Sequence, residues 1–369
     1  MVKGHDYLLE VASYQPGASE EEIRRKYGLT DVIKLASNEN PFGPSPRAIE
    51  AAREALARTH RYNDGGAALR DALASKHGCA YEAVTVNNGS DALIHQIMRT
   101  FLLPGETALS CEGGFVSFGI AVRTVGSVAT FTPMAGGYRF DVEALAAAIT
   151  SSTKIVYVPN PNNPTGTHLS HEEVAFLLSR LPTTTLLVLD EAYTEYATAM
   201  APTSYPDGIA LAHPNVLTLR TFSKAYGLAA MRIGYAVGSP DVVKWLLKTK
   251  LPFDPNGIGC AAALAALADQ QHVEQTVTSA TNEMKLLSTT LHECGYTTSK
   301  SVANFVFIEC GSSEHAKEFH DSLLHRGFIT RPLGGFGHPS CVRISLGLPE
   351  QNAKLAEALK ELASSFVND

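Results

Sequence analysis

The chain has 369 residues, a formal net charge of −7, and hydrophobic and charged contents of 45% and 18%. This length exceeds what one hydrophobic core usually organises, so two domains are expected. The acidic balance and the lack of a basic run argue against nucleic-acid binding, and the lack of an apolar run of about 20 residues argues against a membrane-spanning helix. The 13 histidines form no H-E-x-x-H or similar pattern, which argues against a metal site.

The six cysteines contain no C-x-x-C pair. A chain of this size does not need disulfide bonds to fold, so reduced thiols in a cytoplasmic protein are expected. The first residues lack the apolar segment of a signal peptide, which agrees with this prediction.

The N-terminal region predicts two helices and one strand. The first helix follows a cap at Ser19, the strand covers residues 32–35, and the second helix covers residues 46–59. A polar loop containing Asn40 follows the strand. A polar turn at residues 61–66 then leads into a further helix.

A possible phosphate site follows the strand at residues 84–86. The next residues, Asn87-Asn-Gly-Ser-Asp91, open a helix whose apolar residues are spaced by four. Free N–H groups at a helix start can bind a phosphate, although Ser90 and Asp91 could equally serve only as helix caps. The strand at residues 107–111 is followed by an aromatic residue, Phe115.

Strands and helices alternate from residue 155 to residue 237, which predicts a mainly parallel, doubly wound sheet. Asn163, Asp190 and Lys224 each lie just beyond an apolar strand. Because ligands in parallel sheets bind beyond the carboxyl ends of the strands, these residues are expected to converge on one crevice. Glu191 is less suited to that crevice, because the next residue along a strand points to the opposite face.

Lys224 lies in a glycine-containing turn with Thr221, Ser223 and Arg232 nearby. A desolvated lysine can have a lowered pKa and react with an aldehyde, and hydroxyl groups beside an arginine suit a phosphate. With Asp190 as an acid partner for a pyridinium nitrogen, the set matches the needs of pyridoxal phosphate. A solvated surface lysine is the simpler alternative.

The pattern changes after residue 240. A long helical region is expected from residue 242 to about residue 294, followed by alternating short strands and helices. The predicted fold class is α/β. A large domain at residues 31–270 has a mostly parallel, doubly wound sheet carrying pyridoxal phosphate. Residues 1–30, which include an N-terminal arm, and residues 271–369 form a smaller α+β domain.

The chain resembles the fold-type I pyridoxal-phosphate aminotransferases and, more narrowly, their histidinol-phosphate aminotransferase branch. The resemblance covers essentially the whole chain, and the combination of its motifs in order is specific. The motifs are Asn163-Pro-Thr-Gly166, Asp190-x-x-Tyr193, Ser223-Lys224 and Arg232 for the wider family, and Leu35-Ala-Ser-Asn-Glu-Asn-Pro-Phe-Gly-Pro-Ser-Pro46, Arg331-Pro-Leu-Gly-Gly-Phe-Gly337 and Val342-Arg-Ile-Ser-Leu-Gly347 for the branch.

This resemblance implies how the cofactor is held. Lys224 binds the aldehyde of pyridoxal phosphate covalently and later moves a proton at the substrate Cα, while Asp190 keeps the ring nitrogen protonated. Asn163 and Tyr193 donate to the ring oxygen, and Phe115 stacks on the ring unless it is an ordinary core residue. The implied phosphate ligands are Ser90, Asp91, Thr221, Ser223 and Arg232.

The resemblance also implies contacts to the substrate and to a second subunit. Arg331 and Arg343 bind the anionic end of the substrate, although Arg331 could instead form a surface salt bridge, and Tyr14 and Asn40 are further substrate-side residues. Tyr62 reaches the cofactor phosphate of the neighbouring subunit of a homodimer, unless it is only a surface turn residue.

The function implied is transamination between L-histidinol phosphate and 2-oxoglutarate in histidine biosynthesis. An aromatic amino-acid aminotransferase is the first alternative, because a flat ring and an anion occur in both kinds of substrate. A pyridoxal-phosphate-dependent decarboxylase of an amino-acid phosphate is the second, and a non-enzymatic regulatory domain that binds the cofactor is the third.

Overall fold

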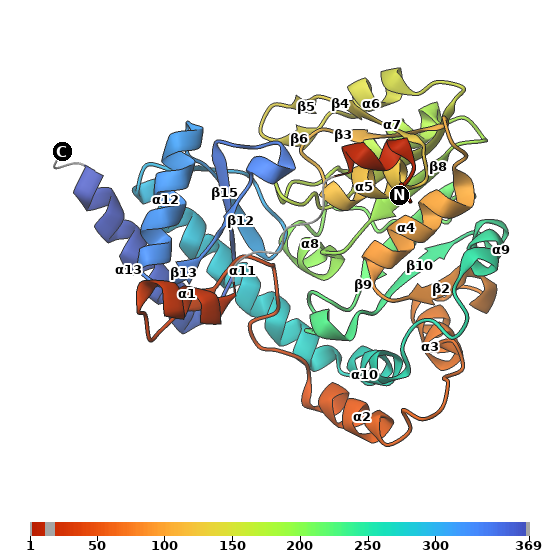
Figure 1. Ribbon diagram of the computed structural model, residues 1–369, viewed down its shortest axis with the longest axis horizontal. Helices are drawn as coiled ribbons and strands as arrows, with labels where there is room; N and C mark the ends of the chain where they lie inside the picture. The colour runs from red at the N-terminus through yellow and green to blue at the C-terminus, as the bar shows by residue number, and fades with distance from the viewer. Residues whose placement is uncertain (1, 12–18, 367–369) are drawn as a thin grey trace.

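A computed structural model describes residues 2–11 and 19–366 of the chain. Figure 1 shows two parts, a larger one built around a wide sheet and a smaller one that contains both the early helix α1 and the C-terminal helix α13. Ile23 of α1 packs with Leu324 and Ile329 from the C-terminal region of the chain. The division of the chain near residue 270 stays a prediction.

The larger part is organised by a seven-stranded sheet. All neighbouring strands run parallel except β10, which is antiparallel to both of its neighbours. The mostly parallel, doubly wound sheet is therefore confirmed. In spatial order the strands are β2 (Val84–Asn87), β10 (Gly234–Gly238), β9 (Val216–Thr221), β8 (Leu186–Asp190), β7 (Thr153–Pro159), β3 (Thr107–Cys111) and β4 (Val128–Thr132).

Helices cover both faces of this sheet, which explains why the central strands are apolar along their length. Successive residues of β7 enter opposite cores: Tyr157 packs into the cluster beneath α4, α5 and α9, and Val158 into the cluster beneath α6 and α7. The helices between residues 46 and 267 are α2 (Pro46–Leu56), α3 (Ala67–His77), α4 (Ser90–Phe101), α5 (Val116–Thr124), α6 (Val142–Ala148), α7 (His171–Arg180), α8 (Thr194–Met200), α9 (Pro240–Thr249) and α10 (Gly257–Leu267).

The smaller part is built on a four-stranded antiparallel sheet in the order β11-β12-β15-β14. A separate parallel pair joins β1 to β13, so an early strand is hydrogen-bonded to a late one. The elements are β1 (Ile33–Lys34), β11 (Thr297–Thr298), β12 (Phe305–Glu309), β13 (Phe328–Ile329), β14 (Arg331–Pro332), β15 (Cys341–Ser345), α1 (Glu20–Tyr27), α11 (Gln270–Glu293), α12 (Ser313–His325) and α13 (Pro349–Phe366).

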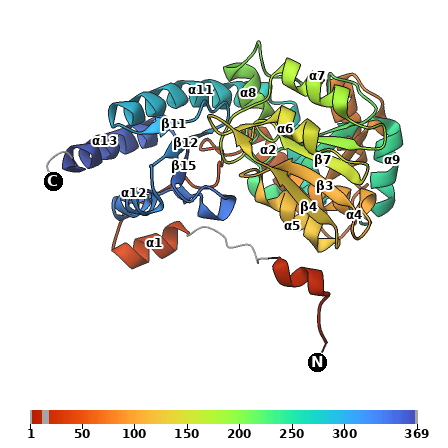
Figure 2. The same cartoon turned by 90° about the horizontal axis from the view of Figure 1, so that it is seen from above.

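The remaining elements are short. Within residues 2–11 and 19–366 they are one hairpin of two short strands and four 3-10 helices. They are β5 (Met134–Ala135), β6 (Arg139–Phe140), η1 (Asp6–Glu10), η2 (Tyr81–Ala83), η3 (Ala229–Met231) and η4 (Gly334–Phe336). The view from above places η1 apart from α1, on the side of the large sheet (Figure 2).

The long helical region expected from residue 242 to residue 294 is wrong in detail, because it divides into α9, α10 and α11. Between α9 and α10, Phe253 has a φ of 64° and Pro255 has no N–H group, and neither residue can continue a helix. The helix expected at residues 46–59 ends earlier, at Leu56.

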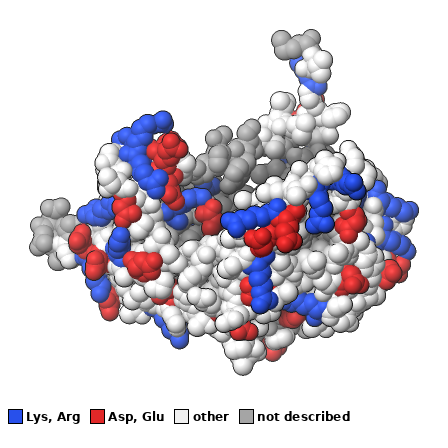
Figure 3. Space-filling model, turned by 90° about the horizontal axis from the view of Figure 1, so that it is seen from below, with Lys and Arg blue, Asp and Glu red and all other residues white. Residues whose placement is uncertain are grey.

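Within residues 2–11 and 19–366, no helix combines the length and the apolar character needed to cross a bilayer. In the same part of the chain, no group of three or more His, Cys, Asp or Glu side chains could hold a metal ion. Figure 3 shows acidic and basic side chains mixed on the face seen from below.

Candidate active site

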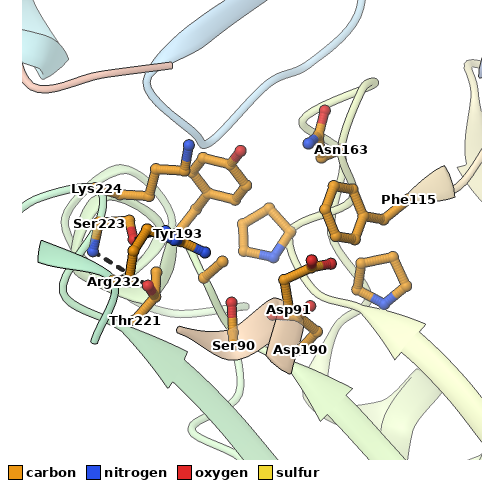
Figure 4. A pocket seen from close by; sticks show the side chains of 13 residues that line it. Ser90, Asp91, Phe115, Asn163, Asp190, Tyr193, Thr221, Ser223, Lys224 and Arg232 are labelled. Carbon is orange, nitrogen blue, oxygen red and sulfur yellow. Dashed lines mark hydrogen bonds between the residues drawn. The ribbon is translucent and has the colours of Figure 1, made fainter. Parts of the chain in front are cut away.

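One pocket lies at the carboxyl ends of β7, β8 and β9, beside the start of α4 (Figure 4). Its empty volume is about 580 Å³ including the opening. All the predicted cofactor residues except Tyr62 line this pocket. The lining residues are Ser90, Asp91, Phe115, Pro159, Pro161, Asn163, Asp190, Ala192, Tyr193, Thr221, Ser223, Lys224 and Arg232.

Asp190 is a buried carboxylate with one oxygen left open. Its Oδ2 accepts a hydrogen bond of 2.6 Å from the Tyr157 hydroxyl, whereas Oδ1 has no partner within the described residues. Burial raises the pKa of Asp190 to about 6, and the Tyr157 hydrogen bond opposes that rise. A buried acceptor without a partner is costly, so this oxygen fits a ligand that donates a proton, such as a pyridinium nitrogen.

Tyr157, which bonds to Asp190, was not predicted as a site residue. It lies inside the apolar strand β7, is fully buried, and stacks on Phe118 with a distance of 5.0 Å between the ring centres. A tyrosine in an otherwise apolar buried strand needs a partner for its hydroxyl, and this requirement was the available signal.

Lys224 lies in the turn after β9, on the side of the pocket opposite Phe115 (Figure 4). Its amine donates to the Ser37 carbonyl oxygen at 3.1 Å and lies 5.7 Å from the centre of the Tyr193 ring. Burial first, and then the Arg343 guanidinium, lowers the pKa of Lys224 to about 8. A substantial fraction of the amine is therefore neutral near physiological pH, which is the form that attacks an aldehyde.

The start of α4 forms an anion-binding cradle. The N–H groups of the first turn, at Ser90 and Asp91, have no partner within the helix and carry the positive end of its dipole. Gly234 of β10 permits close contact, because a Cβ there would lie 2.4 Å from the Ser90 nitrogen. A Cβ at Gly89 would likewise lie 2.6 Å from Nη2 of Arg232.

Arg232 and the hydroxyl groups complete this cradle. Arg232 has a φ of 53°, and its Nη1 donates to Ser223 Oγ at 3.2 Å. Thr221 Oγ1 accepts from the Ser223 backbone N–H at 3.1 Å. The guanidinium, the hydroxyl groups and the helix start thus meet at one end of the pocket (Figure 4), where a phosphate group fits.

Tyr193 is held by the N-terminal segment. The Asn38 side-chain amide donates to the Tyr193 hydroxyl at 2.9 Å, and Asn38 itself accepts from Ser345 Oγ at 2.8 Å. Asn38 was not predicted as a site residue. Its φ of 55° suits asparagine, so the Asn38-Glu-Asn40 sequence was a weak signal for a specialised loop.

The two predicted substrate arginines lie opposite each other. Arg331 of β14 and Arg343 of β15 are Cα partners in the antiparallel register. Arg343 is buried and donates to the Ala36 carbonyl oxygen at 2.7 Å and to Asn163 Oδ1. Both guanidinium groups lie 5.8 Å from the Phe336 ring centre. Like charges in direct opposition disfavour a sheet, so the pair suits an anion placed between or beside them.

Of the remaining predicted site residues, Asn40 and Tyr62 do not line the pocket, and Tyr14 is not among the described residues. The Asn40 amide donates to the Ala225 carbonyl oxygen at 2.9 Å and to Thr276 Oγ1 at 3.1 Å, so it supports the turn after Lys224 and does not line the pocket. Tyr62 is 81% exposed and does not line the pocket of its own chain. Tyr14 lies outside the described residues.

The residues present fit pyridoxal phosphate. The open Asp190 oxygen suits the ring nitrogen, Phe115 offers a ring face, Lys224 offers an amine for the aldehyde, and the cradle suits the phosphate. The chemistry of the donors therefore agrees with the expectation drawn from the sequence.

Comparison with known proteins gives one consistent result. The family model described as aminotransferase class I and II matches residues 30–359. The histidinol-phosphate aminotransferase of Anaeromyxobacter sp. (strain Fw109-5) is 42% identical over 96% of this chain and 97% of its own. Histidinol-phosphate aminotransferase 2 of Pseudomonas fluorescens (strain Pf0-1) is 39% identical over 96% of this chain and 95% of its own.

Solved structures agree with these relatives. Histidinol-phosphate aminotransferase from Sinorhizobium meliloti, in complex with pyridoxal-5'-phosphate, matches with a TM-score of 0.89 and 32% identity over 99% of each chain. A double mutant of Thermus thermophilus aspartate aminotransferase matches with a TM-score of 0.83 and 26% identity, over 99% of this chain and all of that one. The protein belongs to the histidinol-phosphate aminotransferase family, within the pyridoxal-phosphate-dependent aminotransferases of class I and II.

Proposed function

We propose that this enzyme interconverts L-histidinol phosphate and 2-oxoglutarate with imidazole-acetol phosphate and L-glutamate, in histidine biosynthesis. The amino group passes between the phosphate compound and the dicarboxylate. The observation that carries the proposal is Arg343, which donates to the pocket residue Asn163 and lies opposite Arg331 in the sheet. The names and nearly full-length similarity of the relatives support the choice of substrate.

The chemistry divides between the cofactor and the chain. When bound, pyridoxal phosphate supplies an aldehyde for the amino group and a ring that takes up electrons from the substrate Cα. Lys224 would hold the cofactor aldehyde, and its released amine would move a proton between the substrate Cα and the carbon of that aldehyde. Its lowered pKa suits this role, because a base with a pKa of about 8 is partly neutral at pH 7 to 8.

Asp190 and Tyr193 set the state of the ring. The open Oδ1 of Asp190 holds a proton on the ring nitrogen, and the Tyr193 hydroxyl, oriented by Asn38, donates to the ring oxygen. Asn163 is the second donor to that oxygen. Phe115 covers one face of the ring and limits its movement.

The arginine pair binds the anionic ends of both substrates. Arg343 has a fixed guanidinium, because it is buried and bonded to the Ala36 carbonyl oxygen, so it suits bidentate contact with the carboxylate of glutamate or 2-oxoglutarate. Arg331 is less buried and suits the more distant phosphate of histidinol phosphate.

The protein acts as a homodimer in the cytoplasm, and Tyr62 donates to the cofactor phosphate of the partner subunit. Tyr62 is exposed in one chain and stacks on Phe253, itself 53% exposed, with 4.1 Å between the ring centres. Leu56 and Leu251 are also more than half exposed nearby in the chain. A set of large apolar side chains left in water is typical of an interface.

Kinetics with defined amino donors test the function. We expect kcat/KM for histidinol phosphate with 2-oxoglutarate to exceed that for phenylalanine, and glutamate to form in equal amount to the oxo product. A higher kcat/KM for phenylalanine would identify an aromatic amino-acid aminotransferase. Release of carbon dioxide from an amino-acid phosphate, without glutamate, would identify a decarboxylase.

Tyr62→Phe tests the dimer contact. We expect the dimer to persist in sedimentation, because the ring and its stacking on Phe253 remain. The dissociation constant of the cofactor should rise about tenfold, the usual effect of losing a hydrogen bond to a charged group. A monomeric wild-type protein with full activity would contradict this part of the proposal.

A further inference from the structure

A second set of charged residues lies behind the cofactor pocket, at the same strand ends. Glu191 follows Asp190 at the end of β8, and Arg220 precedes Thr221 in β9. Arg220 Nε and Nη2 donate to Glu191 Oε2 at 3.0 and 2.7 Å. Since neighbouring residues of a strand point to opposite faces, this pair lies on the reverse side of the sheet edge.

The ion pair is buried and anchored on its outer side. Glu191 is fully buried and Arg220 is 7% exposed. Arg220 Nη2 also donates to Asp207 Oδ1 at 2.6 Å, and that oxygen caps a turn by accepting the Ile209 N–H at 2.9 Å. The remaining oxygen of Glu191, Oε1, accepts the Gly208 N–H at 2.6 Å. Every oxygen of Glu191 therefore has a partner.

Stability alone does not explain this arrangement. Buried ion pairs lose most of their Coulomb attraction to desolvation, and apolar or neutral side chains of similar size often serve a fold equally well. Here the pair joins the two strand ends that carry Asp190 and Thr221. Asp190 would hold the ring nitrogen and Thr221 the phosphate, two groups of one cofactor, so the spacing of these residues has to match that molecule.

We propose that Glu191 and Arg220 are positioning residues, whose buried ion pair holds Asp190 and Thr221 at the spacing that pyridoxal phosphate requires. The pair touches neither substrate nor cofactor. It acts through the backbone of β8 and β9, whose ends it joins from behind. The proposal does not depend on which amine the enzyme uses, because it concerns cofactor binding alone.

The test is the double variant Glu191→Gln with Arg220→Met, which removes both buried charges together. The amide oxygen that replaces the Glu191 carboxylate can still accept the Gly208 N–H, and Asp207 is exposed enough for water to solvate it. We expect the unfolding temperature of the protein without cofactor to fall moderately, because the new amide NH2 group at position 191 no longer faces Arg220. We expect the dissociation constant of the cofactor to rise at least about tenfold, because small misplacements of binding groups are costly.

The visible absorbance of the loaded enzyme gives a second readout. Its pH midpoint should shift in the double variant, because Asp190 no longer meets the ring nitrogen at its proper place. The control is Arg139→Met with Glu173→Gln, which neutralises another ion pair, 2.7 Å long, whose side chains on β6 and α7 are 40% and 29% exposed. This control should leave both the cofactor affinity and the pH midpoint unchanged.

Arg220→Lys keeps the charge but loses the planar fork. If the double variant does not fold, this single variant decides the question, and we expect it to fold with reduced cofactor affinity. Wild-type affinity and an unshifted pH midpoint in either folded variant would overturn the proposal. An equal loss of cofactor affinity in the Arg139 and Glu173 control would also overturn it, because the effect would then be general.

Discussion

Replacing Tyr157 with phenylalanine tests how the fold keeps Asp190 ionised. The change removes one hydroxyl and leaves the ring stacked on Phe118, so the packing of the core is kept. It also removes the 2.6 Å hydrogen bond to Asp190 Oδ2. In the protein without cofactor, neither carboxylate oxygen then has a side-chain donor among the described residues.

The size of the effect follows from the strength of that bond. A hydrogen bond to a charged group contributes about 1.5–3 kcal/mol, and 1.36 kcal/mol corresponds to about one pKa unit. The pKa of Asp190, about 6 in the wild type, should therefore rise by about one to two units. With the cofactor bound, a proton that stays on the Asp190 carboxyl group is not held on the ring nitrogen. The ring should therefore take up electrons from the substrate Cα less readily.

Urea unfolding of the protein without cofactor, from pH 5 to pH 8, measures this shift. A carboxyl group whose pKa is raised on folding holds its proton more tightly in the folded state, so it lowers stability as pH rises towards the folded pKa. In the wild type this loss is complete shortly above pH 6. In Tyr157→Phe the loss should continue to about pH 8, so the stability difference between the two proteins should grow by about 1.5–3 kcal/mol.

A control removes the titrating group. On an Asp190→Asn background, Tyr157→Phe should change stability by an amount that does not vary with pH. A constant stability difference between wild type and Tyr157→Phe would refute the reasoning, because it would mean that the hydroxyl does not favour the ionised carboxylate.

Three further predictions follow from the site. Asp190→Asn should raise the stability of the cofactor-free protein at pH 8 by about 3 kcal/mol, because the pKa rise from 3.8 to about 6 is then absent, and it should abolish activity; no gain in urea unfolding would contradict this. Arg343→Lys should raise KM for 2-oxoglutarate at least about tenfold with little change in cofactor affinity, because the planar fork is lost; an unchanged KM would count against the carboxylate contact. Gly234→Ala should weaken cofactor binding at least about tenfold in fluorescence titration, because its Cβ would lie 2.4 Å from the Ser90 nitrogen, while Gly136→Ala, where a Cβ meets nothing within 4 Å, should bind normally.

The sheet and most of the pocket could be predicted because their signals are local. Apolar runs such as residues 186–189 identify buried strands, and the polar residue at the end of each run identifies the ligand-binding edge. The face of Glu191 was also predictable, because side chains alternate along a strand, and Glu191 does pair with Arg220 behind the pocket. The individual roles of the site residues stay predictions.

The supporting contacts could not be predicted because their partners are distant in sequence. Asn38 bonds to Tyr193 across 155 positions, and no local pattern links the two. Tyr157 looked like one more apolar strand residue, and its hydroxyl acquires a role only when β7 lies next to β8. The break between α9 and α10 depends on the left-handed backbone of Phe253, which a helical pattern of apolar residues does not reveal.

The central claim is that Lys224 carries the cofactor, and reductive trapping tests it most directly. The protein is loaded with pyridoxal phosphate, reduced with borohydride, digested and analysed by mass spectrometry. We predict that the added mass lies on the peptide containing Lys224, and that Lys224→Ala yields no labelled peptide. Label on another lysine in the wild type, or no label at all, would contradict the account.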